Sequence, residues 1–317
     1  MSVKTIQGAK TKSYLSRLKK DMFSVNGALY LMILVPMAIL IIFHYVPMWG
    51  VQIAFKDFRA SLGITESPWV GLKHFKKFFS YYRFGDVMRN TLMINLYDLA
   101  TFPLSLVLAI LFNYIGAQKY KRFVQTVSYA PHFISTVVMC SMILQFLSAR
   151  GGLINAFLGV FGVPAVNYMA KPQYFYTIYI WSGVWQGIGY SSIIYIAALA
   201  GISPELHEAA IVDGANIWQR IWHIDIPGVL PTFCILLIMR CGSLLSVGYE
   251  KVLLLQNNLN STVSEVISTY SYKVGLASSS PQYSYSSAIG LFTSLINMIM
   301  LIIVNKISDR LSGSSLF

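Results

Sequence analysis

Long apolar runs, separated by short polar stretches, dominate the chain. A helix crosses the hydrocarbon of a bilayer with about 20 mostly apolar residues. Runs of this length cover residues 27–49, 90–115, 123–147, 175–200, 230–255 and 285–305. The pattern therefore predicts an all-α fold, a polytopic membrane helix bundle with six transmembrane helices.

Composition supports this prediction and narrows the possible chemistry. Hydrophobic residues make up 56% of the 317 residues and charged residues only 11%, whereas soluble domains are about a quarter charged. Cys140, Cys234 and Cys241 each lie inside an apolar run without metal-ligand spacing, so we expect them to be small buried apolar side chains. The five histidines form no metal-spaced pair. We therefore assign no metal site and no general base.

Basic residues outnumber acidic ones and give a formal net charge of +12. They lie between apolar runs and at the chain ends, which favours anionic membrane lipid over nucleic acid as a partner. Residues 1–26 are predicted to be a basic cytoplasmic tail, because the apolar run that follows is too long for a cleaved signal. An even number of spans then places both termini in the cytoplasm. The outer loop 50–89 opposes this orientation with several basic residues, although long loops carry less weight.

Aromatic residues gather in and beside the same loop. They are Trp49, Trp69, Phe75, Phe78, Phe79, Tyr81, Tyr82 and Phe84. One interpretation is an interfacial aromatic belt with a short helix on the membrane surface. The other is a docking surface for an external partner, and both can hold.

The segment between the fourth and fifth runs has its own helix signals. Ser203 can cap a helix, Pro204 suits its first position and Glu205 suits its dipole. The apolar residues that follow at helical spacing are Leu206, Ala210, Ile217 and Ile221. The pattern predicts a short amphipathic helix that is too short and too polar to cross the membrane.

A motif lies in this segment. Residues 208–215 read Glu-Ala-Ala-Ile-Val-Asp-Gly-Ala, and residues 224–227 read Ile-Asp-Ile-Pro, with Pro231 beyond. The motif resembles the EAA loop of ABC importer permeases, E-A-A-x-x-D-G-A and then I-x-x-P-x-x-x-P. The resemblance implies the type I ABC importer permease (MetI-like) fold, with a permease domain at 27–317, its core at about 88–306, and a cytoplasmic coupling helix in the loop 203–231.

In that family the loop transmits force from ATPase subunits to the membrane helices. The resemblance assigns ATPase coupling to Glu208, Ala209, Ala210, Asp213, Gly214, Ala215, Ile224 and Pro227. Small residues permit close approach of a partner, the acids offer charges for pairing, and the prolines stiffen the link to the fifth span.

Further stretches resemble carbohydrate-importer permeases, in particular the LplB-like subgroup that serves oligosaccharides from complex polysaccharides. They include residues 44–48, 53–58, 69–72, 90–92, 257–258, 269–270 and 288–292. The resemblance implies a non-catalytic subunit in the bacterial cell membrane that forms half of the translocation pathway for an oligosaccharide.

The implied partners are a second homologous permease, two ATPase subunits and an extracellular solute-binding lipoprotein. ATP and Mg would bind the ATPase subunits. This chain has no G-x-x-x-x-G-K-[ST] loop and is expected to hold no cofactor of its own.

Polar residues inside the apolar runs are candidates for solute contact, because ionisable groups at membrane depth usually face a cavity or a partner. Arg240 could bind solute hydroxyls or a carboxylate, or pair with an acid. Asp98 fits pairing better, and Glu250 with Lys251 are weaker candidates. The polar and aromatic residues that could contact sugar are Trp181, Trp185, Gln186, Tyr190 and Asn297. Packing is the alternative for the aromatic residues, and hydrogen bonding between helices is the alternative for Asn297.

Three other functions remain open. Permeases for polyamines, phosphate or peptides share the EAA loop. A membrane enzyme would need catalytic carboxylates, yet Glu205, Glu208, Asp213 and Asp225 already lie within the loop 203–231. A channel or sensor without a motor would not need that loop.

Overall fold

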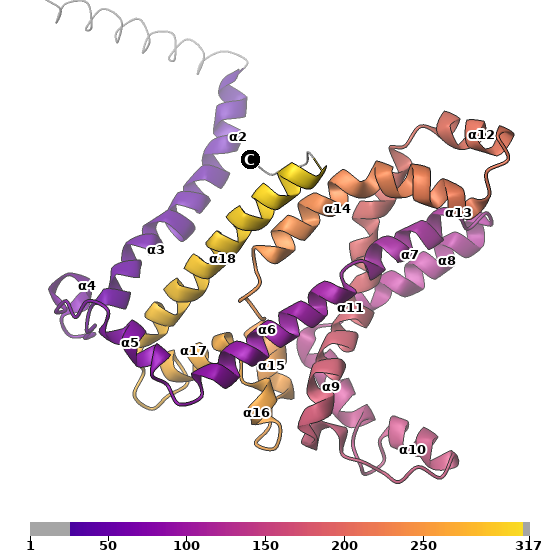
Figure 1. The fold of residues 1–317 in the computed structure, drawn as a ribbon. Helices are drawn as coiled ribbons and strands as arrows, with labels where there is room; N and C mark the ends of the chain where they lie inside the picture. Colours follow the sequence, from indigo (N-terminus) through magenta and orange to yellow (C-terminus); the bar gives the residue numbers. More distant parts are fainter. Residues whose placement is uncertain (1–25, 313–317) are drawn as a thin grey trace, which may run out of the picture. The chain divides into compact units, whose positions relative to one another are not determined.

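A computed structural model describes residues 26–312 (Figure 1). Within this range the regular elements are helices, and the two β-bridges are isolated. The predicted basic tail lies outside the described residues, except for Asn26. The chain divides into two compact units, Met1–Val70 and Gly71–Phe317.

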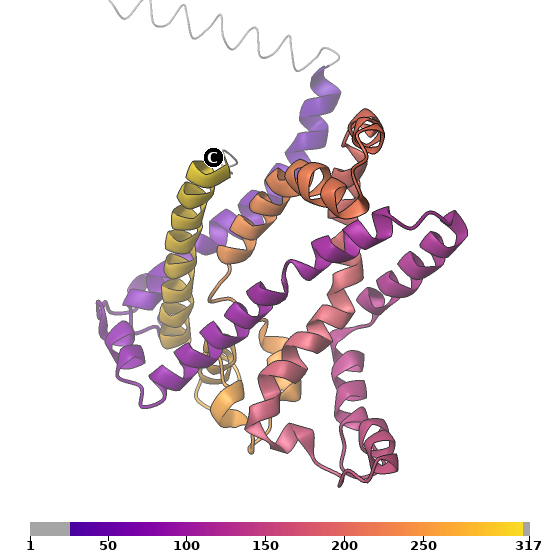
Figure 2. The ribbon, with the colours of Figure 1, turned by 45° about the vertical axis from the view of Figure 1, so that its right-hand side comes forward.

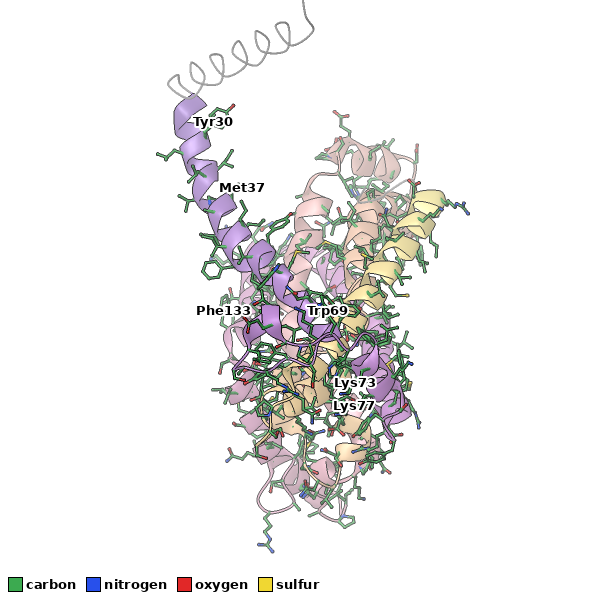
Figure 3. All side chains as sticks on the ribbon, turned by 90° about the vertical axis from the view of Figure 1, so that its left-hand side faces the viewer. Tyr30, Met37, Trp69, Lys73, Lys77 and Phe133 are labelled. Atoms are coloured by element: carbon green, nitrogen blue, oxygen red, sulfur yellow. The ribbon has the colours of Figure 1, made fainter. Side chains whose placement is uncertain are left out.

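The first unit contains a long apolar helix and a short one. Its elements are α2 (Asn26–Leu40), the π-turn η1 (Ile41–Tyr45), α3 (Val46–Met48), the 3₁₀ turn η2 (Trp49–Phe55) and α4 (Gly63–Glu66). The stretch Leu29–Phe55 is long and apolar enough to cross a membrane, so the predicted first span extends beyond Trp49. Side chains such as Tyr30 and Met37 project from α2 and are exposed (Figure 3).

The second unit contains the other long helices. They are α6 with α7 (Phe84–Thr101, Leu104–Asn113), α11 (Pro172–Ala200), the helix α13–η5–α14 (Ile217–Arg220, Ile221–Asp225, Ile226–Cys241) and α18 (Tyr283–Ser312). The shorter helices are α5 (Lys73–Phe79), α10 (Leu153–Val160), η4 (Tyr168–Ala170), α12 (Pro204–Val212), α15 (Tyr249–Leu255), α16 (Ser261–Ser264) and α17 (Ile267–Gly275). Figures 1 and 2 show α12 at one end of this unit and α10, α16 and α17 at the other.

The third predicted span is bent rather than continuous. Its two halves, α8 (Gln118–Tyr129) and α9 (Thr136–Phe146), meet at 98° across the turn η3 (Ala130–Phe133). Pro131 lies in the turn and cannot continue α8, and Ser135 begins α9 by accepting a hydrogen bond from the Val138 amide. The described residues thus contain five long apolar helices, or six spans if the bent pair counts as one.

The fifth predicted span, 230–255, is wrong at both ends. The helix begins at Ile217 and ends at Cys241, and α15 is a separate helix. The helix survives Pro227 because a π-turn precedes it, in which the Ile226 amide donates to the Ile221 carbonyl. Pro227 and Pro231 therefore lie inside this helix, not ahead of it.

Part of the aromatic set predicted in the loop 50–89 is buried in the protein. Phe78 on α5 is buried, and its ring contacts Tyr270 of α17 and Phe292 of α18. Tyr81 stacks on Tyr270 with ring centroids 4.4 Å apart. Tyr82 remains exposed. These contacts tie α5 to the end of the bundle that lies away from α12, so only part of the aromatic set is available for lipid or a partner.

Candidate functional site

Two cavities lie between the long helices of the second unit. The larger, about 580 Å³, is lined by α6, α7, α11 and α14, mostly with apolar side chains. The smaller, about 250 Å³, is lined by α6, α11, α15, the turn before α15, and Arg240 of α14. Its lining is more polar and includes Asn95, Gln186, Ser246 and Lys251.

The wall shared by both cavities contains an ion pair. Asp98 of α6, Gly183 of α11 and Arg240 of α14 line both spaces. The Arg240 guanidinium donates a hydrogen bond to the Asp98 carboxylate, and both side chains are partly exposed to the cavities. The pairing predicted as an alternative for these residues is thus present, and Arg240 also faces the space where a solute could lie.

Lys251 adds a second cation to the smaller cavity. Its Nζ donates to the Tyr179 carbonyl of α11 at 2.6 Å and lies 4.4 Å from the centre of the Tyr179 ring. The absence of a side chain at Gly183 provides the space for the Lys251 ammonium group, because a Cβ at Gly183 would lie 3.1 Å from Nζ. The charged groups that line the two cavities are therefore Asp98, Arg240 and Lys251. The surplus of positive charge favours a ligand with an anionic group.

The remaining predicted solute residues separate into two groups. Gln186 and Tyr190 line the smaller and the larger cavity respectively. Trp181 and Trp185 are not in either lining; the Trp181 indole donates to the Tyr97 hydroxyl at 2.8 Å.

Asn297 joins α18 to the turn after α14. It accepts from the Leu245 amide at 2.9 Å and donates to the Ser246 hydroxyl at 2.8 Å. This is the hydrogen bonding between segments considered as the alternative for Asn297. The geometry therefore favours Arg240, Gln186 and Tyr190 as solute-contacting residues.

The EAA motif forms a helix, a turn and the start of the fifth long helix. α12 has Ser203 at its N-cap and Pro204 as its first residue, as predicted, although the Ser203 side chain makes no capping bond. The single helical face predicted from Leu206 to Ile221 is wrong, because α12 ends at Val212. Gly214 has a φ of +78°, which favours glycine, and the Ala215 amide donates back to the Ala210 carbonyl.

Asn216 then begins the next helix. Its side chain accepts from the Gln219 amide at 2.9 Å, while the Gln219 side chain accepts from the Asn216 amide at 2.8 Å. This reciprocal capping box explains why a new helix starts at Ile217, three residues after Gly214.

The predicted coupling residues lie mostly on the surface of this end. Glu208, Ala209, Asp213, Gly214 and Pro227 are exposed, whereas Ala210, Ala215 and Ile224 are half-buried. They come from α12, the turn after it and the foot of the fifth long helix.

Asp225 is a polar residue of this region that the sequence reading counted only as part of the motif. It is 1% exposed and accepts a hydrogen bond from the Tyr114 hydroxyl at 2.7 Å. His207 of α12 approaches its other oxygen. The sequence signal for a buried polar site was a carboxyl group within an apolar stretch. The residues that contact this carboxyl group lie far away in sequence and could not be identified from it.

Comparison with known proteins identifies relatives over nearly the whole chain. The family model for "Binding-protein-dependent transport system inner membrane component" matches residues 83–313. The polygalacturonan/rhamnogalacturonan transport system permease protein YteP of Bacillus subtilis (strain 168) is 39% identical, over 91% of this chain and 90% of its own length. Protein LplB of the same organism is 38% identical, over 96% and 94%.

A solved structure has the same fold. One chain of a bacterial alginate ABC transporter, in complex with an alginate pentasaccharide-bound periplasmic protein, superposes with a TM-score of 0.86. The two chains are 35% identical, and the match covers 95% of this chain and 100% of that chain.

Proposed function

Because this chain belongs to the family of binding-protein-dependent transport system inner membrane components, we propose that it forms half of a translocation pathway for an acidic oligosaccharide. The family confirms the predicted class, a membrane transport permease. The relatives are transport permeases as well, in agreement with a non-catalytic subunit. The solute and the partners are the proposal.

An acidic sugar is supported by the charges in the cavities. Arg240 and Lys251 are balanced by only Asp98 in the described lining, so a uronate carboxylate would find a cation that has no carboxylate partner there. The same surplus opposes a cationic polyamine. Named relatives and neighbours handle acidic polymers: polygalacturonan in one and the acidic polysaccharide alginate in another.

The partners follow from the same family. A second permease would complete the pathway, and an extracellular solute-binding lipoprotein would deliver the sugar. Two ATPase subunits would hold ATP and Mg, since this chain has no phosphate-binding loop. The EAA residues on and beside α12 would dock on these ATPases, which would place α12 and both chain termini in the cytoplasm.

One observation carries the coupling proposal. The foot of the fifth long helix, Ile217, directly follows the EAA turn, and the same continuous helix contains Arg240 in the wall of both cavities. A displacement of the foot of this helix therefore reaches the proposed solute pathway along one continuous helix.

The test is purification of the tagged chain from membranes with its partners, followed by reconstitution into vesicles. We expect capture of an ATPase and a second permease. We also expect ATP hydrolysis to rise with binding protein loaded with an oligogalacturonide, and to rise less with a neutral oligosaccharide of equal length.

Stimulation by the neutral sugar alone would overturn the acidic solute. Stimulation by phosphate, a peptide or a polyamine would assign a different solute class. Failure to capture any ATPase would overturn the importer function and favour the channel or the enzyme.

A further inference from the structure

Asp225 lies at the meeting point of three elements. It is the last residue of the π-turn η5, at the foot of the fifth long helix. Its side chain is almost fully buried. Burying a carboxylate is unfavourable unless donors or a cation hold it, so its partners indicate why it is there.

Tyr114, just beyond the end of α7, holds one carboxylate oxygen. Its hydroxyl donates to Oδ2 of Asp225 at 2.7 Å. Burial and this hydrogen bond raise the pKa of Tyr114 to about 12, so the hydroxyl stays protonated and donates at any cellular pH. The Arg220 guanidinium lies 5.7 Å from the centre of the Tyr114 ring and makes a cation–π contact with it.

His207 of α12 faces the other oxygen. Its Nε2 lies 3.3 Å from Oδ1 of Asp225, and Oδ1 has no hydrogen bond among the described residues. His207 is half-buried, whereas Val212 at the end of the same helix is 87% exposed.

The rest of α12 lies near the surface. None of its nine residues is buried, and it is connected through the turns at Gly201 and Gly214. The linker before it packs Ile202 close to Gly228, where an added Cβ would lie 2.5 Å from Ile202 Cδ1. Among the described residues, the approach of His207 to Asp225 is the side-chain polar contact between α12 and the bundle.

We propose that Asp225 is a positioning residue that ties α12, through His207, to the fifth long helix and, through Tyr114, to the end of α7. With this tie, movement of α12 displaces two helices that line the larger cavity. Without it, α12 pivots on its two turns while the bundle stays in place. This inference rests on the proposed coupling function of α12.

The test has one measurement on the chain alone and one on the assembled transporter. For the first, a spin label is attached at Val212→Cys after Cys140, Cys234 and Cys241 are replaced by alanine, and its mobility is recorded in membranes. We expect His207→Ala and Asp225→Asn to increase label mobility. The matched control Asp309→Asn, an exposed carboxylate at the end of α18, should leave it unchanged.

The second measurement is the amount of oligogalacturonide imported per ATP hydrolysed in reconstituted vesicles. We expect this ratio to fall at least about fivefold in His207→Ala and Asp225→Asn, the lower end of usual coupling effects, while assembly and ATP hydrolysis persist. His207→Gln should recover most of the ratio, because its amide can donate to Oδ1. A purely structural role would reduce the amount of complex and leave the ratio unchanged.

Tyr114→Phe keeps the ring and removes only the donor, so it serves if the stronger variants fail to assemble; we expect a smaller fall in the same ratio. Unchanged mobility and an unchanged ratio in His207→Ala and Asp225→Asn would overturn the proposal. If the wild-type chain captures no ATPase, the proposed function fails, yet the mobility measurement still decides whether Asp225 holds α12.

Discussion

At the scale of single residues, Gly214 needs its backbone freedom more than it needs space. Its φ of +78° lies in the left-handed region, and a Cβ built there would meet no atom of the chain within 4 Å. An alanine would cost about 1–2 kcal/mol in this conformation, whereas Asn and Asp adopt it more readily. None of the described residues of this chain would therefore crowd a side chain at Gly214. Any steric clash there would have to come from a partner protein.

We predict that Gly214→Asp lowers ATP-driven uptake more than tenfold, while the chain inserts into membranes normally. Asp keeps the turn but presents a charged side chain to the ATPase. Gly214→Asn, of the same shape without the charge, should lose less. Uptake and membrane content of the three proteins provide the measurement, and normal uptake by Gly214→Asp would contradict the coupling role.

The ion pair between Asp98 and Arg240 should determine how well the pathway accepts an acidic solute relative to a neutral one. We predict that Arg240→Gln lowers uptake of an acidic oligosaccharide about tenfold, equivalent to about 1.4 kcal/mol, because Asp98 then repels the carboxylate. Asp98→Asn should lower KM for the same solute, because Arg240 loses its competing partner.

The double variant Asp98→Asn/Arg240→Gln is the matched control for charge. It should import neutral and acidic sugars with similar KM values in vesicle uptake assays. Equal effects of the single variants on neutral and acidic solutes would argue that the pair only stabilises the bundle.

At the scale of elements, proline shapes the long helices in two ways. Pro47 and Pro227 each follow a π-turn, and the helix continues through both. Pro131 instead ends α8 and contributes to the 98° bend before α9. Local sequence does not distinguish these outcomes. A π-turn and a bend are two ways to accommodate a proline, which lacks the amide donor of a regular helix.

The bent pair is held by a close approach of α8 to α11. A Cβ on Gly189 would lie 2.1 Å from the Ser128 carbonyl oxygen, a backbone atom that cannot rotate away. We predict that Gly189→Ala destabilises the chain by about 1–3 kcal/mol, seen as a lower thermal midpoint in detergent. Gly187→Ala is the matched control on the same helix, since its Cβ meets nothing within 4 Å. Equal melting of the two variants would show that α8 yields easily.

The composition and apolar pattern were sufficient to predict the bundle, and the family match confirms its class. The fourth span, predicted at 175–200, agrees with α11 to within three residues. The prediction of the fifth span failed because the apolar stretch from Gly242 to Gly248 is not helical. Hydropathy alone does not reveal such a break between two helices. Lys251 was therefore placed at the end of a span, although α15 brings it against Tyr179, 72 residues away in sequence.

At the scale of the whole molecule, the two ends of the second unit should face opposite sides of the membrane. α12 lies at one end, and the turn between α17 and α18 lies at the other (Figures 1 and 2). The proposed orientation puts α12 in the cytoplasm and this turn outside. Val212 and Leu276 are exposed reporters at the two ends.

We predict opposite labelling of cysteines at these two positions in a background without the natural cysteines. A membrane-impermeant thiol reagent should label Leu276→Cys in right-side-out vesicles and Val212→Cys only in inverted ones. Labelling of both from the same side would contradict an odd number of crossings between α12 and the α17–α18 turn.

The unbroken helix from Ile217 to Cys241 has a mechanical consequence. At 1.5 Å per residue, its axis from Ile217 to Arg240 is about 35 Å long, so tilting the foot by about 5° swings Arg240 by about 3 Å. A swing of that size is as long as a hydrogen bond and would separate Arg240 from Asp98. The helix thus acts as a lever. A small tilt at its foot, with no change in the conformation of α12, is enough to separate Arg240 from Asp98 and to open the wall that the two cavities share.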